Sequence, residues 1–127
     1  MAEAVITKIA KIKMLKARAG DKPLAKIVGM AFGSGGVGSG GEIIKPKSEQ
    51  NALNNELLRK EIGNHAYIGD TACRYTCVLE ANELAGKNIS EIALYDSDGD
   101  IVAIKNFATK GKDADIEMTF NIDDVFD

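Results

Sequence analysis

Three aspartates at alternate positions, Asp96, Asp98 and Asp100, are the residues of this sequence that could bind a metal ion. Calcium prefers carboxylate oxygens, and an EF-hand loop begins with the same Asp-x-Asp-x-Asp spacing. The rest of that template is missing, because Ile101 stands where the loop needs glycine and Phe107 where it needs a bidentate glutamate. A solvated turn is therefore the favoured interpretation, with calcium as the alternative.

The turn interpretation depends on the hairpin that would position these aspartates. Two runs rich in β-branched residues, Ile89–Tyr95 and Ile101–Phe107, flank the pair Asp98-Gly99. An Asp-Gly pair between two such runs predicts a hairpin with a two-residue type I′ turn.

Both faces of this hairpin are largely apolar in the predicted register. The opposed pairs are Tyr95 with Val102 and Ala93 with Ile104 on one face, and Leu94 with Ala103 and Asp96 with Ile101 on the other. A ribbon with two apolar faces needs cover on both, and a small domain usually supplies one cover from its own chain. We therefore expect a second subunit to contact the hairpin, at Ile92, Leu94, Ile101 and Ala103.

A cysteine and the one histidine could form a nucleophilic pair if their side chains met. The pair Gly69-Asp70 predicts a type II′ turn between two strands. In that register His65 lies opposite Arg74, while Cys73 lies opposite Ala66 on the other side of the ribbon. No catalytic residue is therefore predicted, and His65 is expected on the surface or on an edge strand.

A glycine-rich segment, residues 33–41, contains the spacing Gly-x-Gly-x-x-Gly at Gly33, Gly35 and Gly38. A dinucleotide site needs a helix to begin at the third glycine, but Pro46 delays any helix. The Gly-Lys-Ser/Thr ending of a phosphate-binding P-loop is also missing. We therefore expect a flexible loop here, and no cofactor.

Charge is distributed unevenly in this chain of net charge −3. Residues 1–26 hold seven basic and two acidic side chains, whereas residues 91–127 hold ten acidic and three basic ones. An acidic chain with no nucleic-acid motif is not expected to bind nucleic acid as its main task. The basic first helix is expected to be a solvated face or, through Lys8 and Lys11, a contact for an acidic partner.

The periodicity predicts two helices and about six strands. The first helix is expected from its N-cap Thr7 to Ala19, and the second from Ser48 to Gly63. The alternation from Ile116 to Ile122 is typical of a half-buried antiparallel strand. The expected fold class is α+β, an antiparallel β-sheet built from hairpins with two α-helices packed on it.

Length and composition are those of an ordinary soluble protein. The 127 residues, 45% hydrophobic and 28% charged, suit a single domain over residues 1–127. No apolar run is long enough to span a membrane, and no signal-peptide pattern follows Met1. We therefore expect a cytoplasmic protein that does not contact membranes, with its two cysteines free.

Three stretches, residues 17–36, 48–59 and 89–107, together resemble the phage tail-collar fibre family. The most specific part is the run Ile-x-Glu-Ile-x-Leu-Tyr-Asp-x-Asp-Gly-Asp at Ile89–Asp100. The similarity spans roughly residues 6–122. In that family a similar domain forms the N-terminal part of tail fibres and attaches the fibre to the baseplate of a contractile tail.

The resemblance implies a non-enzymatic structural protein of a phage or prophage tail, an adaptor or collar for fibre or tip proteins. It implies other tail or baseplate proteins as partners, and a homo-oligomer, since such fibres are commonly trimers. The protein would assemble in the host cytoplasm and then reside in the virion tail. Family members usually continue into a shaft, whereas this chain stops at Asp127, so receptor binding is not expected. The alternative is a calcium- or carbohydrate-binding β-rich module that uses Asp96 to Asp100.

Overall fold

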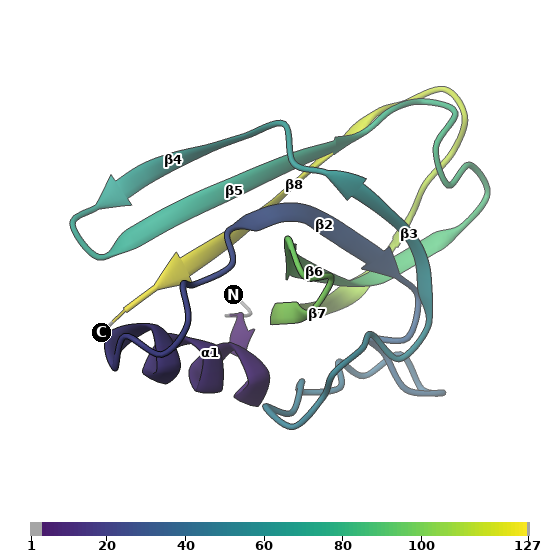
Figure 1. Cartoon of the computed structure of the whole chain (residues 1–127). Helices are drawn as coiled ribbons and strands as arrows, with labels where there is room; N and C mark the ends of the chain where they lie inside the picture. The colour runs from purple at the N-terminus through teal and green to yellow at the C-terminus, as the bar shows by residue number, and fades with distance from the viewer. Residues whose placement is uncertain (1–3, 127) are drawn as a thin grey trace.

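The computed structural model describes residues 4–126. Its elements are β1 (Val5–Ile6), α1 (Lys8–Arg18), β2 (Ile27–Gly33), β3 (Glu56–Glu61), β4 (Asn64–Gly69), β5 (Ala72–Leu79), β6 (Asn88–Asp96), β7 (Ile101–Gly111) and β8 (Met118–Val125). The strands form two antiparallel sheets (Figure 1). The large sheet has five strands in the order β1-β7-β6-β2-β3, and the small sheet has three in the order β4-β5-β8.

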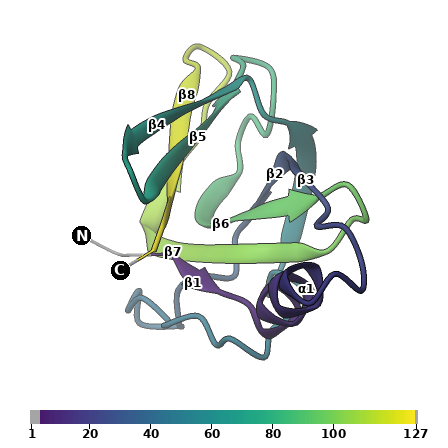
Figure 2. The same cartoon turned by 60° about the vertical axis from the view of Figure 1, so that its left-hand side comes forward.

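The main hydrophobic core lies between the two sheets. Met30, Phe32 and Leu94 of the large sheet pack there against Leu79 and Ile122 of the small sheet. The helix α1 lies on the opposite side of the large sheet, beside β7, as Figure 2 shows. The molecule therefore has three layers, in the order small sheet, large sheet and helix.

The expected α+β fold with two helices is wrong, because residues 4–126 form mainly antiparallel β-sheet with α1 as the single helix. The stretch predicted as a second helix runs from Ser48 to Gly63. It is irregular at first and then forms β3, which pairs with β2 at the edge of the large sheet. Pairing with β2 supplies hydrogen bonds that outweigh helix propensity, which is only a weak preference.

Glu91 explains why the chain before β3 is irregular. Its carboxylate is fully buried and accepts hydrogen bonds from the backbone N–H groups of Gly35 (2.8 Å), Asn54 (2.9 Å) and Asn55 (2.8 Å). Buried N–H groups need acceptors, which inside a helix would be the carbonyls of the preceding turn. At Asn54 and Asn55 this one side chain takes the place of those carbonyls.

The glycine-rich segment, residues 33–41, begins with close packing against β6. The N–H of Gly36 donates to the Ser90 hydroxyl at 2.9 Å, and a Cβ atom on Gly36 would collide with the Ser90 carbonyl. Glycine is needed there because two backbones approach closely. No helix follows Gly38 before β3, so this part of the described chain lacks the helix of a dinucleotide site.

The first helix is confirmed at both ends. The Thr7 side chain accepts a hydrogen bond from the Ala10 N–H, and Gly20 follows the helix with a φ of +81°. Leu15 of this helix is 64% exposed, although it is apolar. The buried side of α1 runs instead through Ala10 and Met14, because the helix rests on β7 by that side.

The predicted hairpin is confirmed as β6 and β7, with Leu94 opposite Ala103. The predicted pair of Tyr95 with Val102 is wrong, because the register shifts after Leu94 and Tyr95 lies opposite Ile101. Its turn differs from the prediction: the Asp96 N–H donates to the Asp100 carbonyl, and Gly99 has a φ of +87°. This is a three-residue loop that ends in a left-handed glycine, the next commonest hairpin connection after the two-residue turns. The Asp96 carboxylate stabilises it by accepting the N–H groups of Asp98 and Asp100, both at 3.0 Å.

The chain covers both apolar faces of this hairpin itself. The small sheet packs on one face, and α1 and the loop residue Leu53 lie on the other. The four residues expected at a subunit contact are at most 2% exposed within one chain: Ile92, Leu94, Ile101 and Ala103. The uncovered face that suggested a second subunit at these positions is therefore absent from the described residues.

Candidate functional site

The three aspartates of the hairpin turn converge on a lysine of the helix. The Lys13 ammonium lies 2.6 Å from Asp96, 3.1 Å from Asp98 and 2.6 Å from Asp100. The Asp96 side chain is 1% exposed, whereas the other two aspartates are about half exposed. The carboxylates lie close enough to hold a cation, within 4.8 Å of one another, but the ammonium already fills the space between them.

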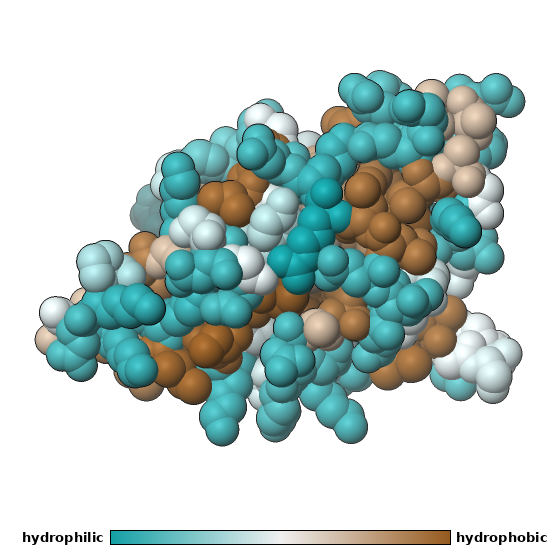
Figure 3. Space-filling model, turned by 45° about the vertical axis from the view of Figure 1, so that its right-hand side comes forward, coloured by the Kyte–Doolittle hydropathy of each residue, from teal (hydrophilic) through white to brown (hydrophobic). Residues whose placement is uncertain are grey.

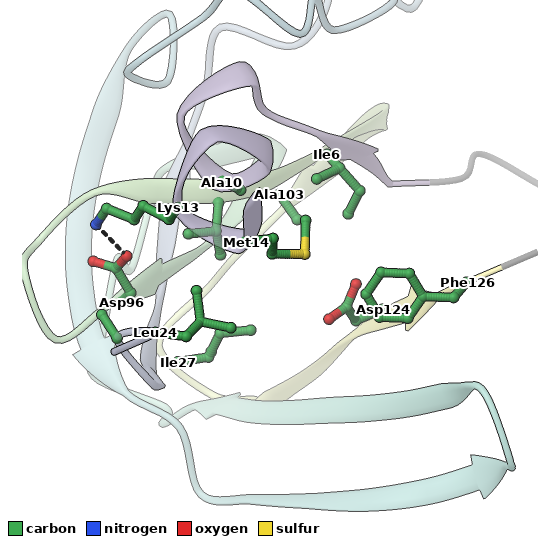
Figure 4. A pocket seen from close by; sticks show the side chains of 12 residues that line it. Ile6, Ala10, Lys13, Met14, Leu24, Ile27, Asp96, Ala103, Asp124 and Phe126 are labelled. Carbon is green, nitrogen blue, oxygen red and sulfur yellow. Dashed lines mark hydrogen bonds and ion pairs between the residues drawn. The ribbon is translucent and has the colours of Figure 1, made fainter. Parts of the chain in front are cut away.

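This aspartate cage fixes the helix to the sheet. Partial burial acts to lower the pKa of Lys13, but hydrogen bonds to Asp100, Asp96 and Asp98 outweigh it and raise that pKa above its usual value. Lys13 is therefore charged at neutral pH. The cage joins α1 to the turn between β6 and β7, and Figure 4 shows its bond to Asp96.

Calcium is expected to leave the melting temperature of the protein unchanged, because the ion would have to displace Lys13. Asp98→Ala is expected to cost less than about 1 kcal/mol, since its contact with Lys13 is exposed and is the longest of the three. Thermal unfolding with calcium and with EDTA checks both statements. Lys13→Met is the positive control, because an emptied cage should gain stability from calcium. A large effect of EDTA on the unmodified protein would restore the metal interpretation.

The structure does not place the histidine and cysteine as a catalytic pair. His65 lies on the exposed edge strand β4 opposite Tyr75, and Cys73 lies opposite Tyr67. The register differs by one residue from the predicted one, because of a bulge between Tyr67 and Gly69. His65 and Cys73 therefore share one face of the ribbon, which corrects the prediction of opposite faces, but they are not opposite each other. The expectation that His65 is an edge-strand residue is confirmed.

The outer side of α1 is basic. The helix has no acidic residue, and Lys8, Lys11, Lys16 and Arg18 are exposed on it. The acidic loop between β7 and β8, residues 112–117, lies at the other end of the molecule in Figure 1. The loop at residues 112–117 is therefore distant from the helix, whereas Asp96, Asp98 and Asp100 of the acidic half lie against the helix at Lys13.

An apolar pocket opens between α1, the start of β2 and the end of β8 (Figure 4). Its volume is about 180 Å³, and its main apolar walls are Ile6, Met14, Leu24, Ile27 and Phe126. One carboxylate, that of Asp124, points into this apolar space at the end away from Lys13. No pattern in the sequence indicated this pocket.

Asp124 is half-buried in this pocket, and burial raises the pKa of its carboxyl group above the usual value. No hydrogen bond or ion pair within residues 4–126 compensates that burial, which is the single cause of the shift. A sequence signal for it existed: the alternation of Phe120 and Ile122 places Asp124 on the same, inward face of β8. If the predicted alternation had been extended from Ile122 to the next residue on that face, it would have placed the acidic Asp124 among apolar side chains.

Asp124→Asn is expected to raise the melting temperature near neutral pH. Because the folded-state pKa of Asp124 lies above the unfolded value, the wild-type protein loses stability as the pH rises through that interval. Asparagine does not titrate, so the gain should shrink as the pH falls below about 4. Thermal unfolding of both proteins between pH 3 and 7 checks this. Equal melting temperatures at pH 7 would contradict it.

The family comparison comes from the sequence as a whole. A family model described as phage tail-collar fibre protein, N-terminal, matches residues 1–121 of the 127. The chain belongs to this family. The tail-collar fibre resemblance stated above is confirmed, and the protein is a structural component of a phage tail that interacts with other tail proteins. No curated protein and no solved structure matches it.

The tail-collar fibre chain has no helix within residues 4–126 that is long and apolar enough to cross a membrane. Its α1 is short and basic, and it is held against the sheet by the aspartate cage.

Proposed function

We propose that this tail-collar fibre protein is a non-enzymatic adaptor or collar domain that attaches fibre or tip proteins to the baseplate of a phage or prophage tail. The observation that carries the proposal is the family match over residues 1–121. A rigid frame suits such a role, because an adaptor must hold its contact surfaces in fixed positions. The two sheets and the aspartate cage provide that frame.

The basic side of α1 is the surface we assign to an acidic tail partner, with Lys8 and Lys11 in the contact. Charged surfaces of opposite sign steer association and select partners, although each exposed pair adds little affinity. Figure 3 shows that on one face of the molecule hydrophilic side chains surround separate hydrophobic areas, a mixture that suits a polar contact with small apolar anchors. The partners are proteins of the tail or baseplate, and neither nucleic acid nor membrane is part of the proposal.

Zero-length cross-linking of carboxyl groups to amines in purified tails tests this assignment. Lys8 and Lys11 are expected to form cross-links with another tail protein, and Lys8→Glu combined with Lys11→Glu should reduce incorporation into tails. Lys87→Glu with Lys110→Glu is the matched control, since these exposed lysines are not on α1 and the change in net charge is equal. Equal incorporation of the two double variants would contradict the role of the helix.

We also propose that the protein self-associates, as a trimer or another homo-oligomer, during assembly in the host cytoplasm and then in the virion tail. Because the hairpin is buried within one chain, the subunit contact must use other residues than Ile92, Leu94, Ile101 and Ala103. Light scattering gives the subunit number directly.

The calcium alternative has lost its support, because Lys13 occupies the centre of the aspartates.

A further inference from the structure

We propose that the pocket between α1 and β8 is a docking site for an arginine or lysine side chain of a neighbouring tail protein. That the neighbour is a tail protein rests on the function proposed above. The chemistry of the occupant rests on the pocket alone.

The first argument is the shape and the lining of the pocket. Its walls are apolar over most of their area, from Met14 on the helix to Phe126 beyond β8. A volume of about 180 Å³ is slightly larger than the engineered cavity of about 150 Å³ that binds benzene, a molecule of six carbon atoms. The pocket therefore accommodates one long side chain. Arginine and lysine have apolar stems that pack well against such walls.

The second argument is the carboxylate of Asp124. It faces the same apolar space without a compensating cation or hydrogen bond within residues 4–126. The nearest candidate in the pocket, Lys13, is already held by three other carboxylates at the opposite end. A half-buried carboxylate without a partner destabilises the fold, and a cation from outside would remove that cost. Charge thus selects a basic side chain over a neutral one.

The third argument is the surface around the pocket. Leu24 and Phe126, which line the pocket, are 53% and 52% exposed, although they are large and apolar. Phe126 and Asp124 also line a neighbouring depression with Tyr67, which is 79% exposed. Exposed apolar patches mark interaction sites, and arginine is enriched among the residues that contribute most binding energy in interface pockets.

The pocket also explains why aspartate occupies position 124 at a cost in stability. Asparagine has nearly the same shape and would avoid burying a charge, so the folded chain by itself gains nothing from the carboxylate. Destabilising polar groups of this kind are typical of functional sites, where stability is exchanged for binding.

Titration of the full chain with n-butylguanidinium tests the pocket without any knowledge of the partner. The readout is the methyl NMR signal of Met14, with the fully buried Met30 as internal reference. We expect a saturable shift of the Met14 signal that needs about tenfold more ligand in Asp124→Asn. Asp123→Asn, which removes an equal charge on the other face of β8, should bind like the wild type. Neutral n-pentanol should bind more weakly than the cation.

Three results would overturn the proposal: no shift at Met14, equal affinity in Asp124→Asn, or equal affinity for pentanol. Incorporation into tails then separates this proposal from the proposed function. Asp124→Asn is expected to enter tails less than Asp123→Asn, and equal entry of both would reject the docking site while leaving the tail function intact. Absence of the wild-type protein from tails would reject the tail function, and the NMR titration would still decide the pocket.

Discussion

Leu94→Asp unfolds the protein or destabilises it by about 4 kcal/mol or more, because it places an unpaired charge in the core between the two sheets. Leu94 is 0% exposed, lies in the centre of β6 and packs with Met30 and Phe32 of the adjacent strand β2. Natural domains have a total stability of only about 5–15 kcal/mol, so one such change removes much of it. Urea unfolding followed by circular dichroism measures the loss.

Leu94→Met is the matched control for this variant. It keeps the volume and the apolar character of the side chain, so it should cost less than about 1.5 kcal/mol. Loss of assembly in Leu94→Asp does not identify a subunit contact, because loss of the fold produces the same result. A Leu94→Asp protein as stable as the wild type would contradict the burial of Leu94 between the two sheets.

Glu91→Ala has the second large expected effect, on the order of 4 kcal/mol, because it removes a fully buried carboxylate and leaves three backbone N–H groups without their acceptor. Glu91→Gln should cost about half as much, since one amide oxygen can keep the bonds to Gly35 and Asn55 while the amide NH₂ group opposes the N–H of Asn54. Urea unfolding gives both values.

Hydrogen exchange adds a local test of Glu91. Exchange should accelerate at Gly35, Asn54 and Asn55 in both variants before it does so in the core. The exposed Glu117→Gln is the control for the loss of charge and should remain within about 0.5 kcal/mol of the wild type. Equal stability of Glu91→Ala and this control would refute the role of Glu91 as an anchor of the loops.

Sequence reasoning succeeded where the decisive interactions are local. The Thr7 cap and Gly20 set the ends of α1, and the Asp98-Gly99 pair between two β-branched runs located the β6–β7 hairpin. It failed from Ser48 to Gly63, where apolar residues at helical spacing predicted a helix. There the backbone is held by Glu91, about 36 residues further along the chain, and no periodicity within the segment reports that contact.

In the candidate sites too, local features were predicted from the sequence and long-range contacts were not. The solvated turn was predicted from Asp98 and Gly99, but the cage needs Lys13, which is 83 residues away from Asp96. Neither the spacing of the aspartates nor that of the lysines indicates this pairing. Asp124 could have been found from the alternation along β8, whereas the pocket around it could not, because α1 and the start of β2 supply the other walls.

Mass spectrometry of sedimented particles, prepared from source cells after prophage induction, tests the central claim most directly. The claim predicts that this chain is enriched together with tail sheath and tube proteins, at a constant ratio to them across the gradient. If the chain instead stays in the soluble fraction while sheath and tube proteins sediment, it is not a component of the assembled tail, and the adaptor role is contradicted.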